Sequence, residues 1–369
     1  MTMAFDQGEE RVHCDDPAAI LREQAVPPRA WTPDNLTADV PPIFYDMTRE
    51  AKNEIADALR RIKMRGLHPQ NVEQQDFRVP SFARDVPMLR DHLDRGCGFV
   101  VLRGLDVAAL TEDQALIVYW GLGNYLGRVM RQDLSGARTD FVSDKEEDEK
   151  SKSVEVGGKI EDGGWDPYRV IDTNKFCTLH TDNAYSNPRP PDYVGLMCLS
   201  NAAVGGESLL MSAYTLHNQI LEQHPEYLER LYQDFSWDTP PLQTLPDGPP
   251  TKAMPIFEFK DDELVIHYLD LYLEPGMERA GTPMTPEEKE IQAFLDAQML
   301  RDDLMFRYLL QPGETLFFNN RWNIHGRDAF EDTVEQSRKL VRLWMWRRHT
   351  GPGMDPVALD AAEFGILLD

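Results

Sequence analysis

His180 and Asp182, separated by one residue, constrain this 369-residue chain more than any other feature when they are considered with the distant His325. Residues two apart on an extended strand point to the same side, so His180 and Asp182 can reach one metal ion from one strand or strand end. His325 must then come from a second strand, brought close by a long excursion of the chain. Two imidazoles and one carboxylate suit iron(II) with open coordination positions, although zinc sites use the same residue types. We therefore predict that these three residues bind iron(II) and leave positions open for a chelating cosubstrate and for dioxygen.

The sequence around these residues carries further motifs in a fixed order. They read Phe176-Cys-Thr-Leu-His-Thr-Asp-Asn-Ala-Tyr185, Gly205-Gly-Glu-Ser208, Gly313-Glu-Thr-Leu-Phe-Phe-Asn-Asn320, His325-Gly-Arg-Asp-Ala-Phe330 and Ser337-Arg-Lys-Leu-Val-Arg342. From about Gly96 to Trp346 the chain resembles the taurine dioxygenase family of 2-oxoglutarate-dependent oxygenases, the group that includes clavaminate synthase and gamma-butyrobetaine hydroxylase. The resemblance implies iron(II) as cofactor, 2-oxoglutarate and dioxygen as cosubstrates, and succinate and carbon dioxide as products.

Three residues are candidates for binding the cosubstrate. A guanidinium grips a carboxylate with two parallel hydrogen bonds, and the spacing of Arg338 from His325 resembles that in gamma-butyrobetaine hydroxylase. We therefore expect Arg338 to hold the distal carboxylate of 2-oxoglutarate. Arg342 lies on the same strand face and could hold the substrate, or the cosubstrate in place of Arg338; a basic surface strand is the alternative for both. The resemblance implies that Ser208 donates a hydrogen bond to the cosubstrate carboxylate, and the alternative is a serine that only begins a strand.

Composition limits the partners and the compartment. Sixty-three acidic residues against 38 basic ones give a formal charge of −25, which argues against nucleic acid and against an anionic membrane surface as partners. Four cysteines without a CxxC pair fit reduced thiols, and neither a signal-peptide pattern nor an apolar run approaching ~20 residues is evident. We expect a cytoplasmic protein that acts on a small molecule. A homo-oligomer, and a substrate bound to a carrier protein, both stay open.

Short apolar segments and helix-start signals predict the fold class. Helix signals include a threonine cap with glutamine or glutamate three residues later, at Thr111 and Thr285. The predicted helices cover 47–64, 87–95, the segment after 111, 215–223, 225–234 and 285–300; the predicted strands cover 98–103, 194–199, 208–212, a hairpin at 256–268, 314–318 and 338–346. Many short strands, with helices gathered in insertions, indicate a mainly β protein with α insertions and a double-stranded β-helix core, the cupin-like jelly roll. The resemblance implies the same fold.

The expected organisation is one catalytic unit with additions at both ends. Residues 1–75 form an N-terminal arm and a helix that packs on the core, residues 76–350 form the double-stranded β-helix oxygenase domain, and residues 351–369 form a C-terminal tail. Within the central domain lie an acidic loop at 144–164, either a lid or a solvated insertion, and a helical insertion at 213–300. Similar proteins place substrate contacts near His267, Asp270 and Tyr272, but these residues also fit a plain alternating strand, which is the favoured interpretation.

The predicted activity is hydroxylation of an unactivated C–H bond in a small polar metabolite. An amino-acid-like substrate is favoured because Arg342 could hold a substrate acid. Desaturation or cyclisation by the same oxidising chemistry is an alternative outcome at the same site. Alternatives of another class are a non-catalytic cupin-like binding protein and a zinc hydrolase.

Overall fold

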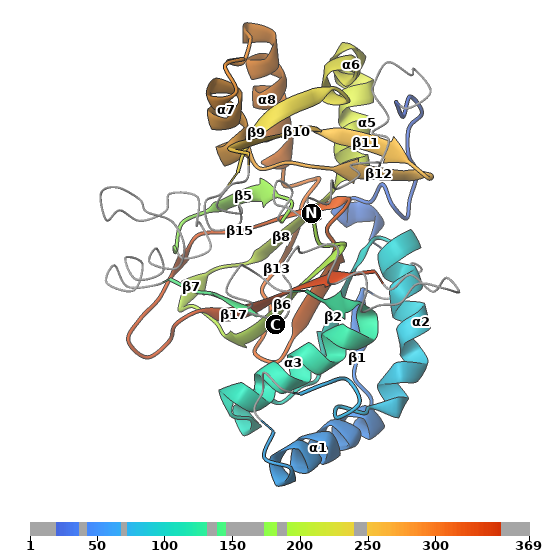
Figure 1. The fold of residues 1–369 in the computed structure, drawn as a ribbon, viewed down its shortest axis with the longest axis vertical. Coiled ribbons are helices and arrows are strands. Elements are labelled where there is room, and N and C mark those ends of the chain that lie inside the picture. Colours follow the sequence, from blue (N-terminus) through green and yellow to red (C-terminus); the bar gives the residue numbers. More distant parts are fainter. Residues whose placement is uncertain are drawn as a thin grey trace, which may run out of the picture.

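Two β-sheets form the centre of the protein, with helices outside them (Figure 1). The computed structural model describes residues 20–36, 43–67, 72–130, 139–144, 173–182, 190–239 and 249–347. The larger sheet runs in the order β1 (Phe44–Asp46), β2 (Phe99–Arg103), β14 (Thr315–Asn319), β6 (Tyr193–Ser200), β17 (Lys339–Trp346) and β3 (Arg128–Val129), with β4 (Asp140–Val142) also paired to β17. The smaller sheet runs in the order β13 (Phe306–Tyr308), β8 (Ser208–Ser212), β15 (Asn323–Arg327) and β5 (Cys177–His180). The predicted β core with helices around it is therefore confirmed.

Strand β17 shows how alternation divides the molecule into two layers. Val341, Leu343 and Met345 belong to an apolar cluster with the N-terminal helices. Leu340 and Trp344 belong to a second cluster that includes residues of the smaller sheet. Because successive side chains on a strand point to opposite faces, the outer face of the large sheet packs on helices and its inner face packs toward the small sheet.

Three helices cover the outer face of the large sheet, in the lower part of Figure 1. They are α1 (Arg49–Met64), α2 (Pro80–Arg95) and α3 (Glu112–Leu126). The predicted start of α3 is confirmed, since Thr111 and Gln114 make both hydrogen bonds of the capping box. The predicted start of α2 is wrong by seven residues, because Pro80, and not Pro87, occupies the first turn and Pro87 lies inside the helix.

The second group of helices lies at the opposite end of the molecule and is mixed with strands (Figure 1). It contains α5 (Ala213–Gln223), α6 (Leu228–Leu231), β9 (Asp234–Asp238), β10 (Thr251–Pro255), the hairpin strands β11 (Phe257–Lys260) and β12 (Glu263–Ile266), α7 (Asp270–Arg279) and α8 (Pro286–Met299). The expected helical insertion 213–300 is therefore a mixed α/β insertion. The predicted helix 225–234 is only a 3-10 turn at Pro225–Tyr227 followed by α6. The interpretation of Asp270 and Tyr272 as strand residues is wrong, because both lie in α7.

A network of charged side chains ties the insertion and α2 to the core. Arg347, directly after β17, pairs with Asp94 of α2 at 2.9 Å and with Glu263 of β12 at 2.9 Å. Arg321 pairs with the same Glu263 and, at 3.6 Å, with Asp192. Glu263 therefore lies between two guanidiniums that belong to the core.

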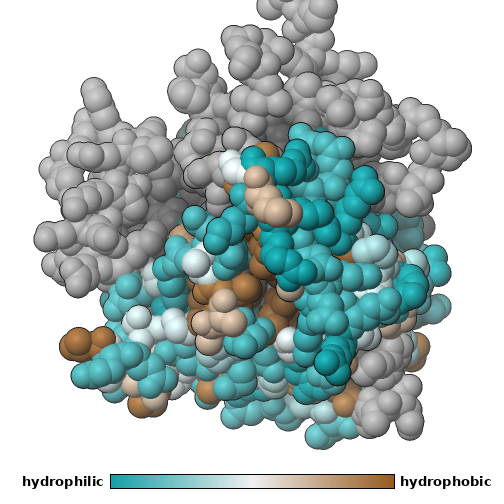
Figure 2. Space-filling model, turned by 90° about the horizontal axis from the view of Figure 1, so that it is seen from below, coloured by the Kyte–Doolittle hydropathy of each residue, from teal (hydrophilic) through white to brown (hydrophobic). Residues whose placement is uncertain are grey.

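Smaller elements and the surface complete the description. Strands β7 (Val204–Gly205) and β16 (Phe330–Glu331) pair with each other, and 3-10 turns occupy Pro33–Asn35 and Val107–Ala109. Within the described ranges, no helix is long and apolar enough to cross a membrane. The face seen from below is mostly hydrophilic around a small apolar hollow (Figure 2). The acidic loop beyond residue 144 and the tail 351–369 lie outside the described residues, and the domain boundaries stay a prediction.

Candidate metal centre and cosubstrate site

The predicted ligands His180, Asp182 and His325 converge at one buried point. Strands β5 and β15 are antiparallel neighbours in the small sheet, and His325 lies directly opposite His180 in their register. Asp182 follows two residues after His180. Its Oδ1 atom lies 3.6 Å from Nε2 of His180, and its Oδ2 atom lies 3.9 Å from Nε2 of His325. The ligand atoms of all three residues lie within 4.8 Å of one another, so they could hold one metal ion.

The two imidazoles are oriented by their neighbours. Nδ1 of His180 lies 2.7 Å from the carbonyl oxygen of Thr178. Since a carbonyl only accepts, Nδ1 carries a proton, and Nε2 is the nitrogen that could bind a metal. The ring of His325 lies between those of His180 and Phe318, with centroids 4.3 and 4.6 Å away. Burial, and then His180, lower the pKa of His325 to about 3, so this ring is neutral at pH 7 and able to bind a metal.

Both carboxylate oxygens of Asp182 have donors. Arg342 donates to Oδ1 at 3.3 Å, and the indole N–H of Trp344 donates to Oδ2 at 2.7 Å. Burial alone would raise the pKa of Asp182, but Arg342 and the imidazoles outweigh it and hold that pKa well below its usual range. Arg342 also donates to Asp140 at 3.3 Å, so its charge is shared between two carboxylates. The aspartate is therefore ionised and fixed in orientation, which suits a metal ligand.

Arg338 lies in a different environment from Arg342. Its side chain is 4% exposed, and its Nη1 atom has no hydrogen-bond partner among the described residues. The guanidinium carbon lies 5.3 Å from the centroid of the Phe330 ring. Burial, and then the neighbouring Arg327, lower the pKa of Arg338 to about 9, because a buried cation is costly and the nearby Asp332 offsets only part of that cost. Such a site is prepared for an anionic ligand.

Ser208 and Gly206 place β8 beside this guanidinium. A Cβ atom on Gly206 would lie 3.0 Å from both Cδ and Nε of Arg338, so the arginine packs directly on the glycine backbone. Ser208 is buried and lies opposite Arg327 in the β8–β15 register. Cross-strand partners lie on the same face of a sheet, and so do residues two apart on one strand. Ser208 is therefore on the same face as Arg327 and His325, and points toward the same interior. The serine, the arginine and the histidines therefore surround one interior region.

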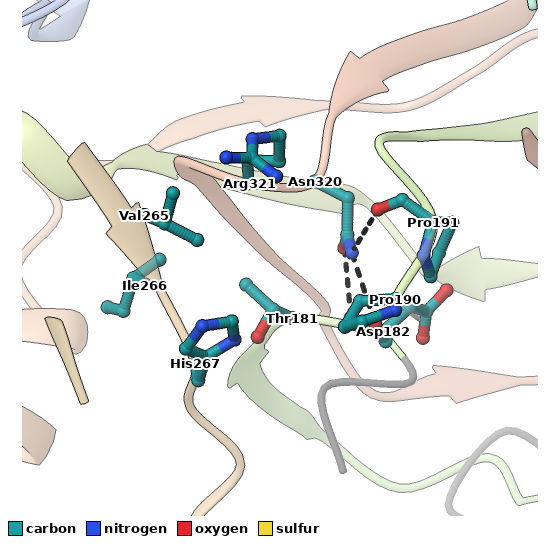
Figure 3. Close-up of a pocket in the computed structure, with 9 residues that line it drawn as sticks. All are labelled: Thr181, Asp182, Pro190, Pro191, Val265, Ile266, His267, Asn320 and Arg321. Atoms are coloured by element: carbon teal, nitrogen blue, oxygen red, sulfur yellow. Dashed lines mark hydrogen bonds between the residues drawn. The ribbon is translucent and has the colours of Figure 1, made fainter. Parts of the chain in front are cut away.

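Some residues of this site were not predicted from the sequence. One is Trp344, which donates to Asp182. Another is Arg327, which donates to the carbonyl oxygens of Thr173 and Lys175 at 2.9 and 2.6 Å. The His325-Gly-Arg motif marked Arg327, but gave no indication that it is buried. Asn320 lies in the wall of a small pocket of about 50 Å³ beside Asp182 (Figure 3). The pocket is lined by Thr181, Asp182, Pro190, Pro191, Val265, Ile266, His267, Asn320 and Arg321.

Comparison with known families defines the class of the protein. The profile of the family described as taurine catabolism dioxygenase TauD, TfdA family matches residues 63–344. The chain belongs to this family and is an iron(II)- and 2-oxoglutarate-dependent dioxygenase. The family resemblance expected from the sequence is confirmed, and the alternatives of a non-catalytic binding protein and a zinc hydrolase are excluded.

Individual relatives cover most of the chain at low identity. The chain is 25% identical over 311 residues to FR-33289 synthase of Streptomyces rubellomurinus, covering 82% of this chain and 84% of the relative. It is 26% identical over 301 residues to the taurine hydroxylase-like protein SAT17 of Stachybotrys chartarum, covering 79% and 71%. Among solved structures, an asparagine oxygenase with Fe(II), 3-hydroxyasparagine and succinate aligns with a TM-score of 0.61 at 18% identity, covering 82% of this chain and 93% of that one. The non-heme iron oxygenase OrfP, with iron, succinate and 3-hydroxyarginine, aligns with a TM-score of 0.55 at 15% identity, covering 83% and 94%.

Proposed function

We propose that His180, Asp182 and His325 are the iron ligands of this dioxygenase. The single observation that carries the proposal is the convergence of their ligand atoms at one buried point, beside an ionised Asp182 carboxylate. Two imidazole nitrogens and one carboxylate are the donor set that suits iron(II) with open positions. Bound iron, together with 2-oxoglutarate and dioxygen, supplies the oxidising chemistry; the residues of the chain hold, orient and shield it.

We further propose that Arg338, assisted by Ser208, holds the distal carboxylate of 2-oxoglutarate. Support comes from the buried guanidinium with an unpaired Nη1 atom and from Ser208 facing the same interior. Arg342 is engaged with Asp182 and Asp140, so we assign it to orienting the metal ligand instead of the cosubstrate. The same contacts remove the reason for placing a substrate acid on Arg342.

The core is, in our proposal, a double-stranded β-helix. Successive core strands alternate between the two sheets, except that β8 and β13, which flank the insertion, both lie in the small one: β5 and β15 also lie in the small sheet, and β6, β14 and β17 in the large one. This alternation is how two sheets wind into a jelly roll. His180 and His325 then lie on two strands of the small sheet, and Asp182 lies just after β5.

The substrate in this proposal is a small amino-acid-like metabolite that is hydroxylated at an unactivated C–H bond. The asparagine oxygenase and OrfP, which share the fold, were solved with hydroxylated amino acids and succinate, and this supports an amino acid here. A cytoplasmic location is favoured by the three described cysteines, Cys97, Cys177 and Cys198, which are all free thiols.

The metal assignment is tested by replacing each ligand. His180→Ala, Asp182→Ala and His325→Ala should each abolish iron binding and 2-oxoglutarate turnover while the far-ultraviolet circular dichroism stays that of the wild type. The reason is that each residue supplies one of only three protein ligands. Wild-type activity in two of the three variants would contradict the assignment.

The substrate class is tested by succinate release. The iron-loaded enzyme is incubated with 2-oxoglutarate alone and with single amino acids, and matched amines and acids that lack one of the two charged groups serve as controls. Acceleration by a free amino acid, with a product heavier by one oxygen atom, is the expected result. Equal succinate release with and without every amino acid would overturn the substrate class while leaving the metal assignment intact.

A further inference from the structure

We propose that Asn320 is a positioning residue of the metal centre, because its side-chain amide fixes the backbone of Asp182. The inference rests on the proposed ligand role of His180, Asp182 and His325. It goes beyond that role by naming what sets the geometry of the carboxylate relative to the two imidazoles.

The contacts of Asn320 with Asp182 are paired. The backbone N–H of Asp182 donates to Oδ1 of Asn320 at 2.9 Å, and Nδ2 of Asn320 donates to the backbone carbonyl of Asp182 at 3.0 Å (Figure 3). One side chain therefore satisfies both backbone groups of a single residue, as a neighbouring β-strand would. Asn320 is 2% exposed, so water does not replace these bonds in the folded protein.

The place of Asn320 in the chain links two metal ligands. It directly follows β14 of the large sheet, and its backbone N–H donates to the carbonyl of Asp192 at 2.8 Å. The turn that begins with Asn320 leads into β15, which carries His325 in the small sheet. Nδ2 also donates to the carbonyl of Pro191 at 3.1 Å. The same turn therefore leads into the strand that carries His325 and bonds to the backbone of Asp182.

The neighbouring Asn319 provides a matched control. Its side chain is 0% exposed, its Nδ2 atom donates to the carbonyl of Leu93 at 3.1 Å, and its Oδ1 atom accepts from the N–H of Arg321 at 3.0 Å. Replacing either asparagine by alanine removes buried hydrogen bonds and should lower stability. Only Asn320 bonds to a proposed metal ligand, so only its loss should change the metal centre itself.

The experiment measures the affinity and the visible spectrum of Co(II) bound to the full-length protein, with the melting temperature of the metal-free protein alongside. Asn320→Ala should weaken Co(II) binding about 10- to 100-fold, the usual range for removing a group that orients a metal ligand, and should shift the d–d absorption bands. Asn319→Ala should lower the melting temperature and leave Co(II) affinity and spectrum at their wild-type values. Asn320→Asp, which keeps the acceptor but loses both N–H donors, should also weaken binding and serves if the alanine variant does not fold.

Two results would overturn the inference. Equal Co(II) affinities for Asn320→Ala and Asn319→Ala would show that Asn320 acts only through stability. Wild-type affinity and spectrum in Asn320→Asp would show that its donors do not position the carboxylate. The variant His325→Ala separates this failure from a failure of the proposed function: if it still binds Co(II) as the wild type does, the three residues are not the metal site at all.

Discussion

At the scale of single residues, Arg338, which directly precedes β17, and Arg342, which lies in β17, have different surroundings although they are only four positions apart. Arg342 is paired with Asp182 and Asp140, whereas Arg338 is buried with an unpaired Nη1 atom beside Phe330. A charged group that already has two carboxylate partners gains little from a third. The cosubstrate should therefore depend on Arg338 far more than on Arg342.

Arg338→Leu should weaken 2-oxoglutarate binding by about 2–5 kcal/mol, the usual loss when a buried charge pair is broken. The dissociation constant is measured anaerobically from the visible absorption of the iron–cosubstrate complex. Binding of 2-oxobutyrate, which lacks the distal carboxylate, should be unchanged in this variant. Arg342→Leu should weaken metal binding more than it weakens cosubstrate binding to the metal-loaded protein. A larger loss of 2-oxoglutarate affinity in Arg342→Leu than in Arg338→Leu would transfer the cosubstrate role to Arg342.

The sequence predicted some residues of the site and missed others for a physical reason. His180 and Asp182 were found because strand periodicity relates residues two apart, and the arginines because they lie near His325 with a family-like spacing. Asn320 bonds to Asp182 across 138 residues, and no local pattern records such a contact. Contacts made by chain folding, such as those of Asn320 and Trp344, became visible only in three dimensions.

At the scale of elements, helix starts with a side-chain cap were predictable and those without one were not. Thr285 and Glu288 make the predicted capping box at the start of α8. Val79, which precedes α2, offers no side-chain cap, so the sequence carried no signal there beyond a proline. Helix α7 contains Pro275 and Gly276, both poor helix residues, and its glycine packs against the backbone of β9 at Asp238. Tertiary packing overrides propensity in that helix.

The turn between β7 and β8 gives an element-scale prediction. Gly206 has φ of +84° and lies against the Arg338 side chain, whereas Gly281 has φ of +76° and no atom within 4 Å of an added Cβ. Either Gly→Ala change should cost roughly 1–2 kcal/mol for a left-handed alanine. Only Gly206→Ala should also raise the dissociation constant for 2-oxoglutarate, because the new methyl group displaces Arg338. Comparable cosubstrate binding in the two variants would show that the turn does not position the arginine.

At the scale of the whole molecule, Glu263 joins the insertion to the core. Burial raises its pKa, but Arg321 and Arg347 outweigh burial and lower it below the ordinary 4.5. A carboxylate whose folded pKa is depressed adds stability above its unfolded pKa, and that contribution is lost as the pH falls through the folded value. The network should therefore weaken below about pH 4.5, the unfolded value.

Glu263→Gln should lower the free energy of unfolding of the metal-free protein by about 3 kcal/mol at pH 7, because two guanidiniums lose their shared carboxylate. Urea unfolding at several pH values between 7 and 3 measures this. The difference between the variant and the wild type should shrink toward pH 3, since protonation removes the same charge from the wild type. A difference that stays constant with pH would place the stabilisation in packing and not in charge.

The pairing of His325 with His180 makes the proposed metal centre sensitive to the alignment of two strands that are remote in the sequence. A slip of one residue between β5 and β15 would turn one imidazole to the opposite face of the sheet. A chain that binds one metal ion per molecule has therefore aligned these strands correctly. For refolded or recombinant material, the metal-to-protein ratio therefore counts the molecules in which these strands are correctly aligned. A circular dichroism spectrum cannot provide this count, because a slipped strand is still a strand.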